Sequence, residues 1–322
     1  MMRSLGLVLV LAAAVLAQDG PPEGYERIAT EALVLDRRPA NAGLAAKASE
    51  LFASSLAAVE ERLGARLGKP APLLVAAPDE AELRARVVAL GGASPPTWAL
   101  AVALPPRRAV VLRCDRLVQG EDFLEPTLRH ELAHLVLGDV ARRSGRRIPR
   151  WLDEGLAQYA ERAVLTREQE LELGAAARFG TLEPFSSLER DFPPHAREAQ
   201  RAYEMSLGFV LWLDRKPGAV RALVADLEEG ASAEEAVRDV AGKPSGEAMA
   251  EWVLVLAERS SIVESLLRSS SFWWGALAVL ALIAFARHAV VTRRLRRQME
   301  KRELVEPPVA PPPAEGAPPP AS

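Results

Sequence analysis

Residues 126–137 read PTLRHELAHLVL and have the apolar rhythm of an α-helix, which we expect Gly138 to end. Side chains four positions apart lie on one face of a helix, so His130 and His134 can bind one metal ion from the same side. Glu131 then lies within reach of a water on that metal. This HExxH pattern rarely arises by chance in a chain of 322 residues with four histidines, and it predicts a metal site.

A second helix supplies the candidate third ligand. Residues 149–159 read PRWLDEGLAQY, and Pro149 can start a helix because no N–H is needed in the first turn. A short basic loop between the two segments lets this helix fold back, which brings Glu154 or Asp153 toward the histidines. Glu154 has the longer reach, whereas Asp153 suits a helix N-terminus electrostatically, so we predict Glu154 as the ligand.

Three protein ligands leave one position on zinc open for water, whose pKa the ion lowers to about 7. The alternative is a structural zinc site with closed coordination, which needs a fourth ligand. Between the apolar segments 5–16 and 271–291, the remaining thiol and imidazole that could be this fourth ligand are those of Cys114 and His195. Cys114 ends an apolar run and suits a buried thiol, and His195 follows two prolines in a predicted loop. The pattern therefore favours an open, catalytic site.

The remaining segments predict an α+β fold, with a small sheet followed by helices. The alanine-rich residues 41–67 form an amphipathic pattern typical of a long helix, and residues 72–77 suit a strand. A helix is expected over 80–90, and a hairpin with a proline-rich turn over 99–104 and 109–113. Nearly everything after the hairpin has helical periodicity.

The motifs HELAH and WLDEGLAQY together resemble the gluzincins, and within them the bacterial MA-type metallopeptidases, whose pattern is HExxH followed by W-L-x-E-G-x-A-x-Y. The resemblance covers about residues 72–256. It implies a zincin-like fold, Zn²⁺ as cofactor, a water activated by Glu131, and a peptide or protein substrate laid along an edge strand, here Ala99–Leu104 or Ala109–Arg113.

Related gluzincins often place a tyrosine phenol over the site, where it stabilises the oxyanion of the tetrahedral intermediate. Tyr203, which precedes an apolar helix in RAYEMSLGFV, is the candidate that the resemblance implies. A packing role for Tyr203 fits the sequence equally well, and His195 is a weaker alternative.

Two apolar segments predict export and membrane attachment. Arg3 followed by the uncharged residues 5–16 is typical of a signal peptide cleaved after Ala17, because twelve helical residues span only about 18 Å of a core of about 30 Å. Residues 271–291 are long enough to span, with Trp273 and Trp274 at one end. The arginine cluster that follows at 293–297 predicts a cytoplasmic C-terminus.

Charge and composition limit the partners. The chain has a net charge of −3, and residues 18–286 carry 32 basic against 39 acidic residues, which gives no footprint for nucleic acid. Half of residues 307–322 are proline, which suits a disordered tail. The oligomeric state is not predicted.

These observations predict the following organisation: a signal peptide (1–17), a leader and helix (18–71), a zincin-like metallopeptidase domain (72–260), a transmembrane helix (271–291) and a basic, proline-rich cytoplasmic tail (292–322). The expected protein is a zinc metallopeptidase anchored in a bacterial-type inner membrane, with its catalytic domain in the periplasm or outside. The alternative is a catalytically silent zinc-binding domain that binds peptide or protein partners in the envelope.

Overall fold

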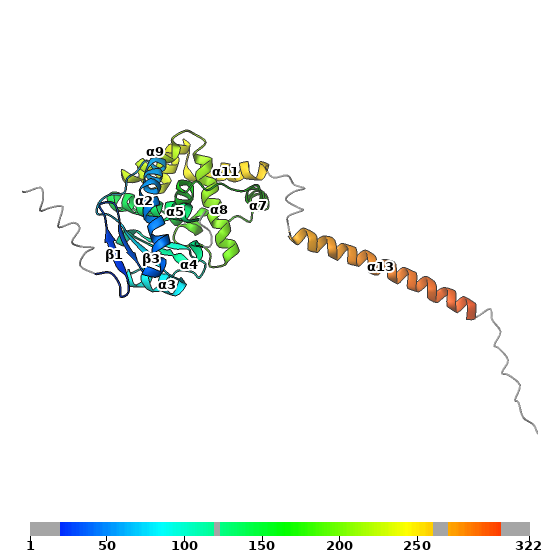
Figure 1. Cartoon of the computed structure of the whole chain (residues 1–322). Helices are drawn as coiled ribbons and strands as arrows, with labels where there is room; N and C mark the ends of the chain where they lie inside the picture. Colours follow the sequence, from blue (N-terminus) through cyan, green and yellow to red (C-terminus); the bar gives the residue numbers. More distant parts are fainter. Residues whose placement is uncertain (1–19, 119–122, 260–269, 304–322) are drawn as a thin grey trace, which may run out of the picture. The chain divides into compact units, whose positions relative to one another are not determined.

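The computed structural model describes residues 20–118, 123–259 and 270–303, and contacts divide the chain into two compact units, with the boundary in the sequence after Ser261. The first unit is α+β, with a small sheet and a larger helical part (Figure 1). Its strands are β1 (Glu26–Ala29), β2 (Val34–Arg37), β3 (Leu73–Ala77), β4 (Ala101–Leu104) and β5 (Ala109–Arg113). Its α-helices are α2 (Ala42–Leu63), α3 (Glu80–Ala89), α4 (Cys114–Leu117), α5 (Leu124–Ser144), α6 (Arg150–Ala160), α7 (Arg167–Arg178), α8 (Ala196–Leu213), α9 (Ala219–Glu228), α10 (Ala233–Ala241) and α11 (Ser245–Arg259). Single 3₁₀ turns are η1 (Pro39–Asn41), η2 (Pro105–Arg107) and η4 (Phe185–Leu188).

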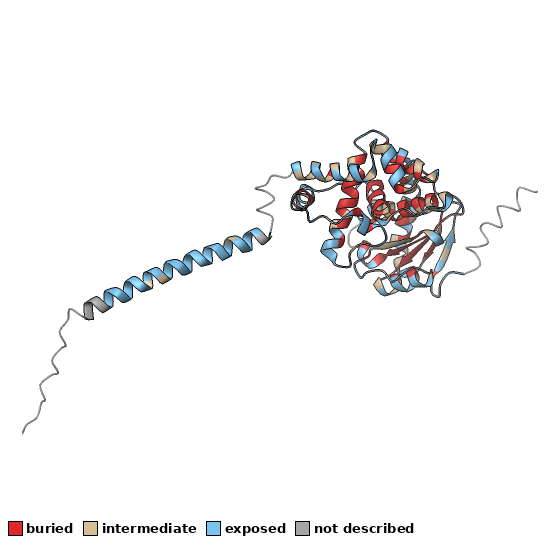
Figure 2. Ribbon diagram, turned by 180° about the vertical axis from the view of Figure 1, so that it is seen from behind, coloured by how far each residue is buried: buried red, intermediate tan, exposed pale blue. Residues whose placement is uncertain are grey.

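The sheet has the strand order β1-β2-β3-β5-β4. The three central strands run parallel, and β1 and β4 pair antiparallel at the two edges. All five residues of β3 are buried because both faces of the sheet are covered. Leu74 and Ala76 belong to the main core with the helices, whereas Leu73, Val75 and Ala77 face a smaller core that α3 closes. Buried residues accordingly gather between sheet and helices in Figure 2.

The structure corrects the N-terminal part of the prediction. Residues expected in a leader include the start of β1, and neither β1 nor β2 is predicted from the sequence. Each strand has only four residues, too few to show a clear alternation. Strand β2 is held by pairing with β3, and β1 is held by pairing with β2 and by an ion pair of 2.7 Å between Arg27 Nε and Asp36 Oδ1. The helix expected at 41–67, the strand at 72–77, the helix at 80–90 and the hairpin are confirmed, with small shifts at their ends.

Gly138 does not end the metal-site helix. The α5 helix continues to Ser144, and Gly145, with φ of 67°, provides the left-handed C-cap. A Cβ atom on Gly138 would lie 2.3 Å from Cβ of Pro105. The glycine is therefore needed because the helix passes against the turn of the β4–β5 hairpin, and the predicted loop from 138 to 148 is partly helix.

The open edge of β4 presents alternate backbone groups. Arg113 N–H donates to Leu100 O at 2.8 Å, so this facing pair is a hydrogen-bonded one. Hydrogen-bonded and non-hydrogen-bonded pairs alternate along an antiparallel ladder, and the register then points the N–H and C=O groups of Ala101 and Ala103 away from β5. Of the two strands proposed for the sheet edge, β4 is the edge strand and β5 is internal.

A second close approach joins α6 to α8. A Cβ on Gly155 would lie 2.6 Å from Ser206 O, so a side chain there would push the helices apart. Beside this contact, the Trp151 ring lies 4.8 Å from that of Phe185 and 5.8 Å from that of Phe209. Helix α6 is thereby fixed through its apolar face, and its polar face is left toward α5.

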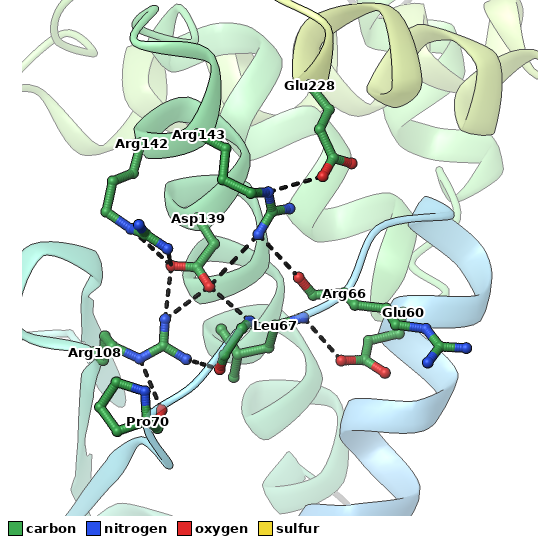
Figure 3. A network of polar contacts seen from close by, with 10 residues as sticks. Glu60, Arg66, Leu67, Pro70, Arg108, Asp139, Arg142, Arg143 and Glu228 are labelled. Atoms are coloured by element: carbon green, nitrogen blue, oxygen red, sulfur yellow. Dashed lines mark hydrogen bonds and ion pairs between the residues drawn. The ribbon is translucent and has the colours of Figure 1, made fainter. Parts of the chain in front are cut away.

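A buried ion pair ties the hairpin turn to α5 (Figure 3). Arg108 Nη1 donates to both carboxylate oxygens of Asp139 at 2.7 Å, and its Nε donates to Pro70 O at 2.9 Å. Gly68 N–H also donates to Asp139, and Arg143 lies 3.8 Å from it. Burial by itself raises the pKa of Asp139, but the bonds from Arg108 and Gly68 outweigh it and lower that pKa.

The second unit contains helix α13 (Ser270–Glu303). Within it, Phe272–Met299 is long and apolar enough to cross a membrane, by length and composition. Residues 272–299 of this helix are largely exposed (Figure 2), as expected of a helix that would face lipid. The helix includes the predicted span 271–291. The predicted signal peptide, 1–17, and the end of the tail, 304–322, lie outside the described residues.

The Arg108–Asp139 pair predicts a pH-dependent loss of stability. Asp139→Asn should lower the free energy of unfolding by about 3 kcal/mol at pH 7, because it leaves the Arg108 guanidinium buried without its carboxylate. A lowered pKa in the folded state stabilises above the unfolded-state pKa of about 3.9 and is lost as pH falls through the folded value. The difference between wild type and variant in urea unfolding should therefore shrink below about pH 4. Asp191→Asn, at an exposed carboxylate, is the matched control, and an equal loss in both variants would contradict the assignment.

Candidate metal centre

Three side chains on two helices converge on one point. Nε2 of His130 and Nε2 of His134, both on α5, lie 3.2 Å apart. Oε2 of Glu154, on α6, lies 3.4 Å from the first nitrogen and 3.6 Å from the second. Ligands placed tetrahedrally around zinc at about 2.0–2.1 Å lie about 3.3–3.4 Å from one another. The spacing of the three atoms therefore matches three corners of a tetrahedral site.

The carboxylate of Glu154 provides an independent test of this fit. Its side chain is 2% exposed, and Oε2 is buried with no hydrogen-bond partner among the described residues. The other oxygen, Oε1, pairs with the guanidinium of Arg150 one turn earlier on α6. One oxygen is thus occupied by a cation and the other faces the histidines, as expected of a monodentate metal ligand.

Two further carboxylates orient the imidazoles. His134 Nδ1 lies 2.9 Å from Asp153 Oδ2, and His130 Nδ1 lies 3.0 Å from Glu161 Oε2. An Nδ1–H that donates to a carboxylate leaves the lone pair of Nε2 free for a metal, which is the usual arrangement around zinc-bound histidines. Asp153 therefore orients His134 and lies outside the group of three residues that could hold a metal.

The charges of the cluster favour a cation at its centre. Burial by itself lowers the pKa of His130, but Glu154 and Glu161 outweigh it and raise that pKa to about 9. The pKa of His134 is raised well above its usual range against burial, by Asp153 and Glu154. Burial raises the pKa of Glu154, yet the two histidines hold it far below its usual range. Positive charge between these groups is stabilised, and a divalent ion can supply it.

Glu131 lies beside the edge strand. Its carboxylate accepts a hydrogen bond from the backbone N–H of Ala103, one of the outward-facing groups of β4. Burial raises the pKa of Glu131, against the opposite effect of the two histidines. A buried carboxylate with a raised pKa, next to a candidate metal site, is suited to take and return a proton.

Tyr203 also lies at the cluster. It is inside α8 rather than ahead of an apolar helix, and the Arg150 guanidinium donates a hydrogen bond to its phenol oxygen. The ring of Phe192 packs edge-on against it at 4.8 Å. Burial and the charge of Glu154 raise the pKa of Tyr203 to about 12, so the phenol keeps its proton at neutral pH. Its O–H is available as a donor close to Glu154.

The other candidates lie elsewhere. Cys114 is buried and accepts a hydrogen bond of 3.2 Å from Asn41 Nδ2, and burial raises its pKa to about 11. His195 is the exposed N-cap residue of α8. Among the described residues, the group whose ligand atoms are close enough to hold one metal ion at this site is His130, His134 and Glu154.

The sequence interpretation missed three supporting residues. Asp153 is named there only as an alternative ligand, and Arg150 and Glu161 are not considered. A helical pattern could have found the last two, because positions 150, 154 and 161 recur on one face of α6 and its C-cap.

The comparison with known families agrees with this geometry. A model of the peptidase MA superfamily matches residues 53–257. The chain belongs to the peptidase MA superfamily. No protein of curated function matches the chain by sequence. The peptidase MA match begins inside α2 and ends inside α11, so it contains every residue of the candidate centre and leaves out β1, β2 and α13.

The geometry separates ligand from supporting carboxylate. Glu154→Ala should abolish stoichiometric zinc binding, because it removes one of three ligand atoms. Asp153→Asn should keep the metal with affinity lowered by about 10- to 100-fold, since it weakens only the bond that orients His134. Metal content after dialysis and competition with a chromogenic chelator measure both effects. Loss of zinc from the Asp153 variant with retention in the Glu154 variant would reverse the assignment.

Proposed function

We propose that this protein is a zinc-dependent metallopeptidase of gluzincin type, with a zincin-like domain that hydrolyses peptide bonds. The observation that carries the proposal is the convergence of two imidazole nitrogens and one unpaired, buried carboxylate oxygen at tetrahedral spacing. Membership of the peptidase MA superfamily supports the same chemistry. Three protein ligands leave a fourth position open, which distinguishes a catalytic from a structural zinc site.

His130, His134 and Glu154 would hold the ion. When bound, zinc supplies a water of lowered pKa and polarises the substrate carbonyl. Glu131 takes a proton from the attacking water and delivers it to the leaving amine. Its position next to the histidines in sequence, its burial and its raised pKa suit both transfers.

The proposed binding site for the substrate is the edge strand β4. An extended peptide can add to an exposed sheet edge through main-chain hydrogen bonds. Ala101 and the carbonyl of Ala103 direct backbone groups to this edge, whereas the Ala103 N–H donates to Glu131. A peptide paired with β4 is thereby brought to the general base, and its backbone can be bound without any requirement for a particular side chain.

Tyr203 is the proposed donor to the oxyanion that forms when water attacks the scissile carbonyl. A guanidinium is a hydrogen-bond donor only, so Arg150 donates to the phenol oxygen of Tyr203 and does not accept the phenol proton. This bond orients the phenol and leaves its O–H to donate to the oxyanion. Arg150 also holds Oε1 of Glu154, so one guanidinium positions both the metal ligand and the oxyanion donor.

The apolar helix α13 supports the proposal that the peptidase is anchored in a membrane. The basic residues after Val291 favour the cytoplasmic side, which would place the catalytic unit in the periplasm or outside a bacterial-type cell membrane. Peptide or protein substrates would then be met in that compartment.

Glu131→Gln tests the reaction. The variant keeps the shape of the side chain and removes its basicity, and it is not a metal ligand in this scheme. It should keep stoichiometric zinc and its thermal stability while peptide hydrolysis falls about a thousandfold, roughly 4 kcal/mol of transition-state stabilisation. Zinc content, a melting curve and turnover of a diverse peptide library are measured on the same preparation.

Two results would contradict the proposed peptidase activity. If zinc-loaded wild type cleaves no library member, the silent zinc-binding domain that recognises envelope peptides becomes the better account. If the Glu131 variant cleaves as fast as wild type, the hydrolysis comes from another site or a contaminant.

Tyr203→Phe tests the oxyanion donor. The variant should lower kcat about 10- to 1,000-fold, the range for one such donor, with KM, zinc content and stability little changed. Tyr159→Phe is the matched control, because the Tyr159 O–H donates to Asp214 at 2.9 Å rather than to the metal centre. Equal kcat in wild type and in the Tyr203 variant would assign Tyr203 to packing.

A further inference from the structure

A groove with a volume of about 410 Å³ lies between α7, α8 and α11, apart from the metal centre. Its volume is within the range of small-molecule sites, about 300–1,000 Å³. From α8 and the turn after it, the groove is lined by Gly208, Leu211, Trp212 and Arg215. These positions are spaced i, i+3, i+4 and i+7, so they form one helical face with an arginine at its C-terminal end.

The opposite wall repeats this pattern. Helix α11 lines the groove with Trp252, Val255, Leu256 and Arg259, again at i, i+3, i+4 and i+7. At the start of both faces, a Cβ on Gly208 would lie 3.1 Å from the Trp252 ring. The two helices meet at this contact, and the groove beside it is lined mostly by apolar side chains, together with arginines that include Arg215 and Arg259.

Neither arginine has a close ion-pair partner in the part of the chain that the structure describes. Arg215 stacks over the Trp212 ring at 4.3 Å and donates to Trp212 O, and no carboxylate among the described residues forms an ion pair with Arg215 or Arg259. Glu170, the acidic residue of the lining, pairs with Arg167 at 3.6 Å. Burial lowers the pKa of Arg215 and the charge of Arg259 lowers it further, whereas the charge of Glu251 raises it in part.

The short distance in sequence between the groove and the candidate membrane span indicates which kind of amphiphilic ligand is available to the groove. Arg259 precedes Phe272, the first residue of the candidate membrane span, by thirteen residues. A chain of that length spans at most about 45 Å. If α13 anchors the protein in a membrane, the membrane lipids are therefore available to this unit at a high effective concentration. Arginine pairs bind phosphate well because the guanidinium donors match its oxygens.

We propose that this groove binds an acyl chain of an anionic phospholipid, with the lipid phosphate between Arg215 and Arg259. The apolar faces of α8 and α11 remove the chain from water, and the phosphate neutralises the two guanidinium groups. This site is independent of the proposed peptidase activity.

Native mass spectrometry of the full chain in detergent micelles tests the site, with dioleoyl phosphatidylglycerol or dioleoyl phosphatidylcholine added in turn. Wild type should retain one phosphatidylglycerol. The double variant Arg215→Gln/Arg259→Gln should lower the retained fraction at least tenfold by removing the phosphate partners. Val255→Trp, which fills the groove from a half-buried position, should do the same with both arginines intact.

The matched control is Arg116→Gln/Arg197→Gln, which removes the same charge at exposed positions and should retain lipid as wild type does. Retention unchanged in the groove variants would place the lipid elsewhere, for example at the arginines that end α13, and would overturn the proposal. Equal retention of phosphatidylcholine, or displacement of the lipid by glycerol 1-phosphate alone, would also overturn it. Zinc content and melting temperature of each variant show that the fold and the metal centre are intact, so this result stands apart from the test of Glu131.

Discussion

Three acceptor atoms, two imidazole nitrogens and one carboxylate oxygen, are held within 3.6 Å of one another in a mostly buried place. Their mutual repulsion is relieved by a positive charge between them, either protons on the histidines or a metal ion. Glu161 and Asp153 bias the choice, because each engages an Nδ1 atom and leaves the Nε2 lone pairs directed at the centre. The three atoms converge only if α5 and α6 are held in one relative position, and the rest of the fold provides the contacts that hold them.

The scaffold meets this constraint through close backbone contacts rather than through the metal-binding residues themselves. Gly138 lets α5 pass against the hairpin turn, and Gly155 lets α6 pass against α8. The Arg108–Asp139 pair then fixes the hairpin to α5 just beyond His134, which sets the distance between β4 and the centre. The edge strand, Glu131 and the three residues of the candidate metal centre are therefore parts of one connected arrangement.

Helix α8 serves two regions of the unit. Its middle carries Tyr203, which faces the metal centre through Arg150, and its C-terminal end forms one wall of the groove that Arg215 helps to line. The two regions differ in chemistry, since the first gathers carboxylates around a cation site and the second gathers arginines beside an apolar surface. A chain with a small net charge of −3 thus separates its charges into sites of opposite preference.

The sequence by itself determined the features that depend on local spacing. His130 and His134 share a face because a helix repeats every 3.6 residues, Glu154 is brought near by the helix that follows, and the length of the apolar run in α13 follows from composition alone. Tertiary structure alone decided that β4 is the edge strand, that the four-residue strands β1 and β2 join the sheet, and that Gly138 is a contact point inside a helix. It also decided that Asp153 lies against His134 and Glu161 against His130. These features depend on which distant segments pack together, and a side chain's partner across such a contact leaves no periodic trace in its own stretch of sequence.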